Sequence, residues 1–176
     1  MNSRIKKVAV VINGAGGVGK DTLCNLAAKH FRVLNVSSIT PIKEIAAECG
    51  WSGEKDDKAR KFLSDLKRLT VEYNDYPTKW IAKKYAEFLS SDYDVMFVHI
   101  REPEEIAKFV KETGGRAKTL LVRGGARMKK SVYGNVSDDR VEDYSYDYYF
   151  LNDRSIADAE RGFKELVYRI LKEIDK

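Results

Sequence analysis

The sequence predicts a three-layer α/β fold, with a doubly wound sheet of five parallel strands between two layers of helices. Short apolar runs alternate with amphipathic helical stretches along the 176 residues, and this alternation is typical of parallel sheets. The first run, residues 8–12, has no polar alternation, which indicates a strand buried on both faces. No repeat or linker divides the chain, so we expect a single domain over residues 1–176.

Strands are expected where short apolar blocks lack helical spacing, and helices where apolar residues recur three and four positions apart. The expected strands span residues 7–13, 33–36, 95–100, 117–122 and 148–151. The expected helices run from the glycine-rich loop to residue 31, and then over residues 41–49, 56–73, 78–89, 103–110 and 155–174.

Several helix ends are marked by residues that favour them. Gly50 suits the end of a helix. Residues 74–77 break the helical pattern, and we expect Thr78 to cap the helix that follows. Ser155 precedes the last helix, with Asp158 three positions on, as in a weak capping box.

A glycine-rich loop follows the first strand. It reads Gly14, Ala15, Gly16, Gly17, Val18, Gly19, Lys20, Asp21 and Thr22. The first seven residues fit the phosphate-binding pattern G-x-x-x-x-G-K. Glycines permit positive φ and close approach to an anion, while successive amides and a helix N-terminus form a positive nest. We therefore predict that the loop cradles the phosphates of a nucleotide, with Lys20 supplying an ammonium group to the outer ones.

The residues after Lys20 distinguish subfamilies of such loops. Switch-type nucleotidases place Ser or Thr there to hold magnesium, whereas this chain has Asp21 and then Thr22. The pattern is similar to nucleoside monophosphate kinases and resembles more closely the deoxynucleoside monophosphate kinase-like group and phosphomevalonate kinases, which carry Gly-Lys-Asp. The resemblance implies a P-loop kinase fold, an ATP donor and Mg²⁺, with Lys20 bridging donor and transferred phosphates and Thr22 touching the donor's inner phosphates.

Two interpretations of Asp21 remain open. It could reach the magnesium ion or the acceptor, or it could be a first-turn carboxylate that complements the helix dipole.

Polar residues that follow the strands define the rim where a doubly wound sheet binds ligands. They are Ser37, Ser38, Thr40 and Lys43 after the second strand, His99, Arg101 and Glu102 after the third, Arg123 and Arg127 after the fourth, and Asn152 and Asp153 after the fifth.

The resemblance extends to this rim. The deoxynucleoside monophosphate kinase-like group ends its third strand with Asp-Val-Arg-Phe-Pro-Asn-Glu, and residues 99–105 here match it at Arg101, Pro103 and Glu105. Weaker likenesses occur at residues 40–44, which look like the family's acceptor-side helix opening, at residues 60–65, and at Ser137, Asp138 and Asn152. The resemblance implies an acceptor-binding helical segment at about residues 38–80, substrate contacts from Lys43, Arg60 and Glu105, and a base contact from Asn152.

His99 departs from the family pattern, which has a metal-binding Asp at that position. Neutral imidazole is a poor ligand for Mg²⁺. The metal would then be held by Asp21 or Glu102, or mainly by phosphates and water. The other interpretation of His99 is a partly buried histidine whose hydrogen bonds are satisfied.

Arginines suit phosphoryl transfer because their planar fork grips phosphate oxygens and compensates their charge. With Lys20 and Asp21, we expect Arg101 and Arg123 to be catalytic, and Arg127 to bind the nucleotide. The irregular segment of about residues 123–145 is expected to act as a lid that excludes water. The nearby tyrosines, Tyr144, Tyr146, Tyr148 and Tyr149, are expected to pack on the sheet.

Composition limits the partners and the compartment. The net charge is +5, but acidic and basic residues are interleaved and no nucleic-acid module is recognisable, so we expect two anionic substrates rather than nucleic acid. No segment is apolar for long enough to span a membrane, and no secretory signal precedes the first strand. Cys24 and Cys49 lack metal or redox spacing, which indicates reduced thiols of a cytoplasmic protein. A homodimer is left open.

The leading functional hypothesis is an ATP-dependent phosphotransferase that moves the γ-phosphoryl group to a small phosphorylated acceptor, a nucleoside or deoxynucleoside monophosphate. One alternative is another small-molecule kinase, similar to phosphomevalonate or dephospho-coenzyme A kinase. Others are a nucleotide-dependent switch and a regulatory or nucleic-acid-associated ATPase. The lack of an Asn-Lys-x-Asp motif, and of Ser or Thr directly after Lys20, counts against a GTP switch.

Overall fold

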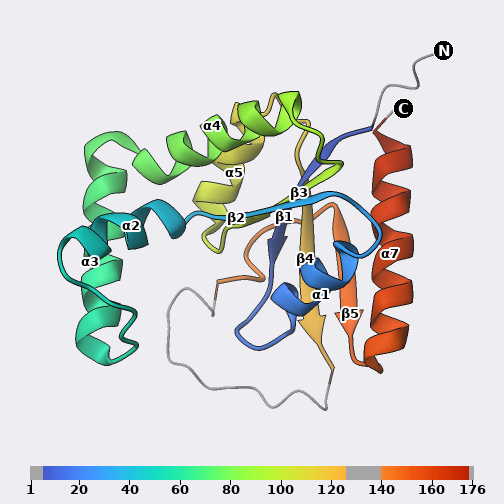
Figure 1. The fold of residues 1–176 in the computed structure, drawn as a ribbon, viewed down its shortest axis with the longest axis horizontal. Coiled ribbons are helices and arrows are strands. Elements are labelled where there is room, and N and C mark those ends of the chain that lie inside the picture. The colour runs from blue at the N-terminus through green and yellow to red at the C-terminus, as the bar shows by residue number, and fades with distance from the viewer. Residues whose placement is uncertain (1–5, 126–139, 175–176) are drawn as a thin grey trace.

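The computed structural model describes residues 6–125 and 140–174. Within them, the chain forms a five-stranded sheet in the order β2-β3-β1-β4-β5, and every neighbouring pair is parallel (Figure 1). The strands are β1 (Val8–Asn13), β2 (Val33–Ser37), β3 (Val95–His99), β4 (Lys118–Gly124) and β5 (Tyr148–Asn152). The predicted fold class is therefore confirmed.

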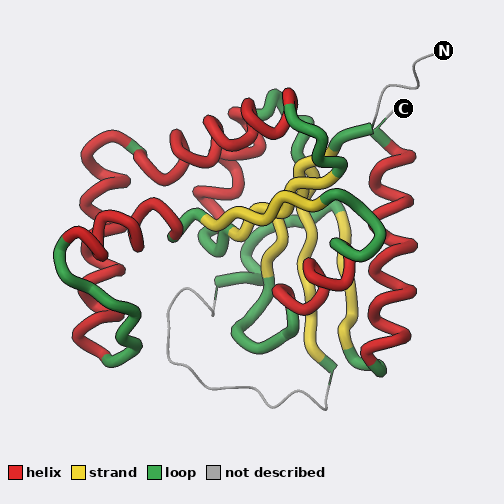
Figure 2. Tube along the Cα trace, viewed as in Figure 1, coloured by secondary structure: helices red, strands yellow, loops and turns green. Residues whose placement is uncertain are grey.

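Helices cover both faces of the sheet, as Figure 2 shows. They are α1 (Lys20–Ala27), α2 (Thr40–Glu48), α3 (Asp57–Asn74), α4 (Tyr76–Ser90), α5 (Pro103–Glu112) and α7 (Ile156–Glu173). Strand β1 is buried along its whole length, which explains its unbroken apolar run.

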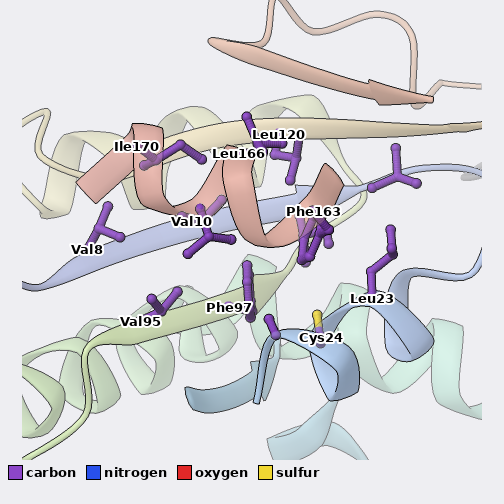
Figure 3. Packing of buried hydrophobic residues seen from close by; sticks show 14 of the residues in the cluster. Val8, Val10, Leu23, Cys24, Val95, Phe97, Leu120, Phe163, Leu166 and Ile170 are labelled. Carbon is purple, nitrogen blue, oxygen red and sulfur yellow. The ribbon is translucent and has the colours of Figure 1, made fainter. Parts of the chain in front are cut away.

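Alternate residues of β1 face two separate apolar cores. Val8 and Val10 belong to one apolar core with residues of α1 and α7, and Figure 3 shows Phe163, Leu166 and Ile170 of α7 along this face of the sheet. Ala9 and Val11 belong to the opposite core, which α4 and α5 complete. Because each core needs its own helical layer, the sheet is doubly wound.

Helices α2 and α3 lie beyond the sheet, on the side opposite α7 (Figure 1). Helix α3 packs against α2 and α4. The structure describes every residue of α3, and of these only Ala59 is fully buried. Leu69 and Tyr73 are exposed. This helix is therefore held less by apolar packing than the helices that cover the sheet.

The predicted helix ends are partly correct. Ser155 accepts a hydrogen bond from the amide of Asp158, as the capping box requires. Thr78 is not a cap, because α4 already begins at Tyr76. Asp75 has a φ of 57°, so one residue turns the chain where a four-residue break was expected. The hydroxyl of Thr78 instead donates to Asp75.

Two further boundaries differ from expectation. Helix α1 ends at Ala27, and a turn follows to Phe31, where the prediction continued the helix. Arg123 lies within β4 rather than after it.

Within residues 6–125 and 140–174, no helix is long and apolar enough to cross a membrane.

Candidate active site

The glycine-rich loop joins β1 to α1 at the carboxyl edge of the sheet, where β2, β3, β4 and β5 end with or next to the predicted residues Ser37, His99, Arg123 and Asn152. Gly14, Gly17 and Gly19 have φ values of 150°, 80° and 88°, which side chains rarely adopt. A Cβ on Gly14 would also lie 2.4 Å from the carbonyl oxygen of Val122. Gly14 is therefore required both by its backbone angle and by the close approach of β4.

Two buried asparagines hold the loop in shape. Asn13 accepts a hydrogen bond from the amide of Gly14 at 2.8 Å through its Oδ1. Asn152 donates through its Nδ2 to the carbonyl of Val18 at 2.9 Å. Because both partners are main-chain atoms of the loop, its conformation is fixed without a ligand.

Of the two asparagines, Asn152 was predicted as a site residue and Asn13 was not. The amide of Asn152 is engaged in holding the loop, and its predicted contact with the donor's base stays a prediction. Asn13 was missed as a site residue, although a polar residue that ends a strand directly after the apolar run of residues 8–12 was a signal for it. Its Nδ2 also donates to the Arg101 carbonyl at 3.0 Å and to the Tyr146 hydroxyl at 2.8 Å.

Lys20 begins α1 and folds back over the loop. Its Nζ donates to the carbonyl oxygens of Gly14 and Ala15, the latter at 3.0 Å. Gly19 caps the helix without any side-chain hydrogen bond, so the positive helix end faces the loop without a capping side chain. Asp21 and Thr22 follow on the exposed face of α1. The arrangement concentrates positive potential where the sequence predicts phosphates.

His99 lies behind this loop as a satisfied, partly buried side chain. Its Nε2 is 2.7 Å from Oδ1 of Asn35 and 3.9 Å from Sγ of Cys24. Burial lowers the pKa of His99, so the neutral ring donates from Nε2 to Asn35. Burial also raises the pKa of Cys24 to about 12, so its thiol stays protonated.

The charges of two predicted catalytic cations act on His99. After burial, which lowers the pKa of His99, the charge of Asp21 raises it and the charges of Lys20 and Arg101 lower it. The carbonyl of Arg101 is tied to Asn13, which fixes the end of β3 beside the end of β1.

Glu102 and Glu105 form a cluster with Lys67 of α3, which the sequence analysis missed. Nζ of Lys67 lies 2.8 Å from Oε2 of Glu102 and 3.1 Å from Oε2 of Glu105. Burial raises the pKa of Glu102, but the charge and hydrogen bond of Lys67 outweigh it and the pKa falls. Burial raises the pKa of Glu105 to about 7, and the charge of Glu102 adds to this against that of Lys67.

Glu102 is paired with Lys67. Its predicted role as a magnesium ligand stays a prediction. Among residues 6–125 and 140–174, no three His, Cys, Asp or Glu side chains gather as a metal site. Asp21 is exposed beside Lys20, and its contact with a magnesium ion stays a prediction.

Arg123 is paired within the protein. Its guanidinium donates to both carboxylate oxygens of Glu142, at 3.0 and 2.6 Å, and lies 4.9 Å from the ring centre of Tyr149. It is half exposed, so a catalytic role for Arg123 requires exchange of this pair and stays a prediction. The neighbouring rings of Tyr144 and Tyr146 pack edge to face, 5.2 Å apart.

The remaining predicted residues lie apart from the loop or outside the description. Lys43 on α2 and Arg60 on α3 are exposed, and Figure 1 shows these helices away from the loop between β1 and α1. Arg127, Ser137 and Asp138 lie outside the described residues, as does most of the predicted lid.

No protein-family model matches the chain, and no curated protein matches it. Solved structures do. Shikimate kinase from Bacteroides thetaiotaomicron superposes with a TM-score of 0.57 at 17% identity, covering 92% of this chain and 98% of the other. Gluconokinase from Sinorhizobium meliloti gives a TM-score of 0.55 at 12% identity, covering 97% of each chain.

This chain has the P-loop kinase fold. A second shikimate kinase, from Aquifex aeolicus, supports the same conclusion with a TM-score of 0.51 at 12% identity, covering 92% of this chain and 97% of the other. At these identities the likeness shows the fold alone, so the activity must be argued from the site of this P-loop kinase fold.

Proposed function

We propose that the protein is a P-loop kinase that transfers the γ-phosphoryl group of ATP, with Mg²⁺, to a small phosphorylated acceptor. The observation that carries the proposal is the Gly14–Thr22 loop, whose glycines at positive φ and hydrogen bonds to two buried asparagines suit a backbone that binds a polyanion.

The residues of the chain supply position and charge for the transfer. The loop amides and the start of α1 bind the β- and γ-phosphates. Lys20 exchanges its contacts with the loop carbonyls for phosphate oxygens. Arg101, at the end of β3, compensates charge on the moving group, and Asp21 orients the hydrated metal. Mg²⁺, when bound, neutralises the phosphate charge.

A nucleoside or deoxynucleoside monophosphate is the acceptor that the motifs favour. Its phosphate oxygen is already ionised near neutral pH, so no general base is required. The predicted acceptor segment carries exposed cations, Lys43 and Arg60, which suit an anionic acceptor. The names of the similar structures, gluconokinase and shikimate kinase, support a small molecule. They also favour a second candidate, a small acceptor without a phosphate group.

An acceptor panel tests the proposal. ADP release is measured with ATP and Mg²⁺ in the presence of nucleoside and deoxynucleoside monophosphates, phosphomevalonate, dephospho-coenzyme A, gluconate or shikimate. Turnover that depends on a monophosphate supports the proposal, and turnover with gluconate or shikimate selects the second candidate. Release without dependence on any acceptor identifies an ATPase or switch. Affinity for nucleic acid that falls steeply with salt would instead indicate a nucleic-acid-associated ATPase.

A further inference from the structure

Lys67 joins α3 to the start of α5, and the first of its two partners lies 35 positions later in the chain. It projects from α3 to Glu102, between β3 and α5, and to Glu105, in the first turn of α5. The exposed fractions of the three side chains are 15%, 32% and 11%, so the cluster is largely shielded from water. Shielding strengthens the attraction between the charges and makes an unpaired member costly.

Two other ion pairs at or beside α3 are of a different kind. Arg68 pairs with Glu72 one turn along α3, at 3.0 Å, and both side chains are more than half exposed. Such a pair stabilises a helix slightly and does not position it. Lys108 of α5 contacts Asp75, the residue directly after α3, at 3.0 Å, but its side chain is 45% exposed, against 15% for Lys67. Lys67 therefore makes the shielded charged link from α3 to α5.

The Lys67 ion pairs are important for placing α3 because few apolar side chains of this helix are buried. Of its residues, all of which are described, Ala59 alone is fully buried. The helix also belongs to the predicted acceptor segment. Its placement therefore depends more on charged contacts between elements than that of α1 or α7.

The cluster is connected to the phosphate loop through hydrogen bonds of the Asn13 side chain. Glu102 directly follows Arg101, whose carbonyl accepts from Asn13. Asn13 in turn accepts from the amide of Gly14. The carboxylate that holds Lys67 is thus one residue from the strand end that is tied to the loop.

We propose that Lys67 is a positioning residue, which holds α3 of the acceptor segment in place relative to Arg101 and the phosphate loop. The inference rests on the proposed function. Without Lys67, the two carboxyl groups face each other without a cation, and α3 loses its shielded link to α5. Acceptor binding should then weaken, whereas the loop, which is held by Asn13 and Asn152, should bind the donor as before.

Lys67→Met, Lys67→Arg and the control Arg68→Met test this proposal. The measurements are acceptor KM and kcat, the affinity for a non-hydrolysable ATP analogue by calorimetry, and hydrogen exchange of α3 amides. We expect Lys67→Met to raise acceptor KM by about tenfold or more, with a smaller change in kcat and donor affinity within about twofold. Lys67→Arg should recover most of the acceptor affinity, because a guanidinium can pair with both carboxylates.

Hydrogen exchange separates positioning from general stability. In Lys67→Met, exchange should rise in α3 and remain unchanged in β1 and α1, while Arg68→Met should leave both unchanged. The inference is overturned if acceptor KM in Lys67→Met equals that in Arg68→Met, or if donor affinity falls equally with it. A wild-type protein that turns over no acceptor overturns the proposed function itself, which is a different result.

Discussion

Asn152, the last residue of the edge strand β5, donates its side-chain amide to the carbonyl of Val18 at 2.9 Å, and both residues are buried. The contact connects the end of the sheet to a loop near the start of the chain, 134 positions earlier. A buried carbonyl that loses its donor pays the desolvation penalty without compensation. The shape of the phosphate loop therefore depends on β5 being in place.

Asn152→Ala should destabilise the protein by about 1–3 kcal/mol and weaken ATP binding, because Val18 loses its buried donor. Urea unfolding gives the first quantity and calorimetry with an ATP analogue the second. Asn25→Ala, an exposed asparagine on α1, is the matched control and should change neither. Unchanged nucleotide affinity in Asn152→Ala would show that the loop keeps its shape without this contact.

Gly14→Ala should impair nucleotide binding more than Gly50→Ala, a substitution at another glycine with positive φ. The new Cβ would lie 2.4 Å from the Val122 carbonyl and 2.9 Å from Cγ2 of Val18, so the loop or β4 must move. Gly50 has a φ of 92°, and a Cβ added there would have no atom within 4 Å. Gly50→Ala therefore introduces backbone strain of about 1–3 kcal/mol but no steric clash. Equal affinity for an ATP analogue in the two variants would contradict the role of close packing at Gly14.

The sheet could be predicted because the strands are short apolar runs, and such runs indicate burial. Val8–Asn13 is wholly buried, and every expected strand is present within one or two residues. The α3–α4 boundary could not be predicted, because it depends on the left-handed conformation of Asp75, which composition does not specify.

The site could be predicted in part, for a related reason. The loop is contiguous in sequence, so its glycines and Lys20 stand together as a pattern. Lys67 is 35 positions from Glu102, and Asn13 is 133 positions from Tyr146, so these contacts arise from folding rather than from local spacing. Arg123 was predicted to be catalytic because a guanidinium group suits phosphate. Its pairing with Glu142 could not be predicted, because folding brings the end of β4 next to a residue that precedes β5.

Lys20→Ala should abolish phosphoryl transfer while leaving the fold intact, because the ammonium contacts loop carbonyls and lies outside the apolar cores. Loss of a phosphate-binding cation that acts in the transition state lowers kcat more than it raises KM. The acceptor-dependent release of ADP measures activity, and circular dichroism measures the melting temperature. Lys29→Ala, which removes an exposed pair with Glu160, is the control and should retain activity. Surviving activity in Lys20→Ala would show that the site has been assigned wrongly.

Glu105→Gln should change how stability depends on pH. Burial, with the nearby charge of Glu102, raises the pKa of Glu105 from its ordinary value of 4.5 to about 7, against the attraction of Lys67. Between those values the folded protein binds more protons at this site than the unfolded chain, so Glu105 makes the free energy of unfolding fall as pH rises. The variant has no carboxyl group to titrate at this position. Its free energy of unfolding should therefore increase relative to that of the wild type as pH rises.

Urea unfolding of both proteins from about pH 5 to about pH 8 measures this difference, which should grow through the range and level off above it. Glu112→Gln, an exposed position at the end of the same helix, should shift the free energy of unfolding by an amount that depends little on pH. If the difference between Glu105→Gln and wild type were constant, or fell as pH rose, the carboxyl group of Glu105 would be ionised throughout. Lys67 would then lie between two ionised carboxylates and would be attracted more strongly than beside one ionised and one protonated carboxyl group.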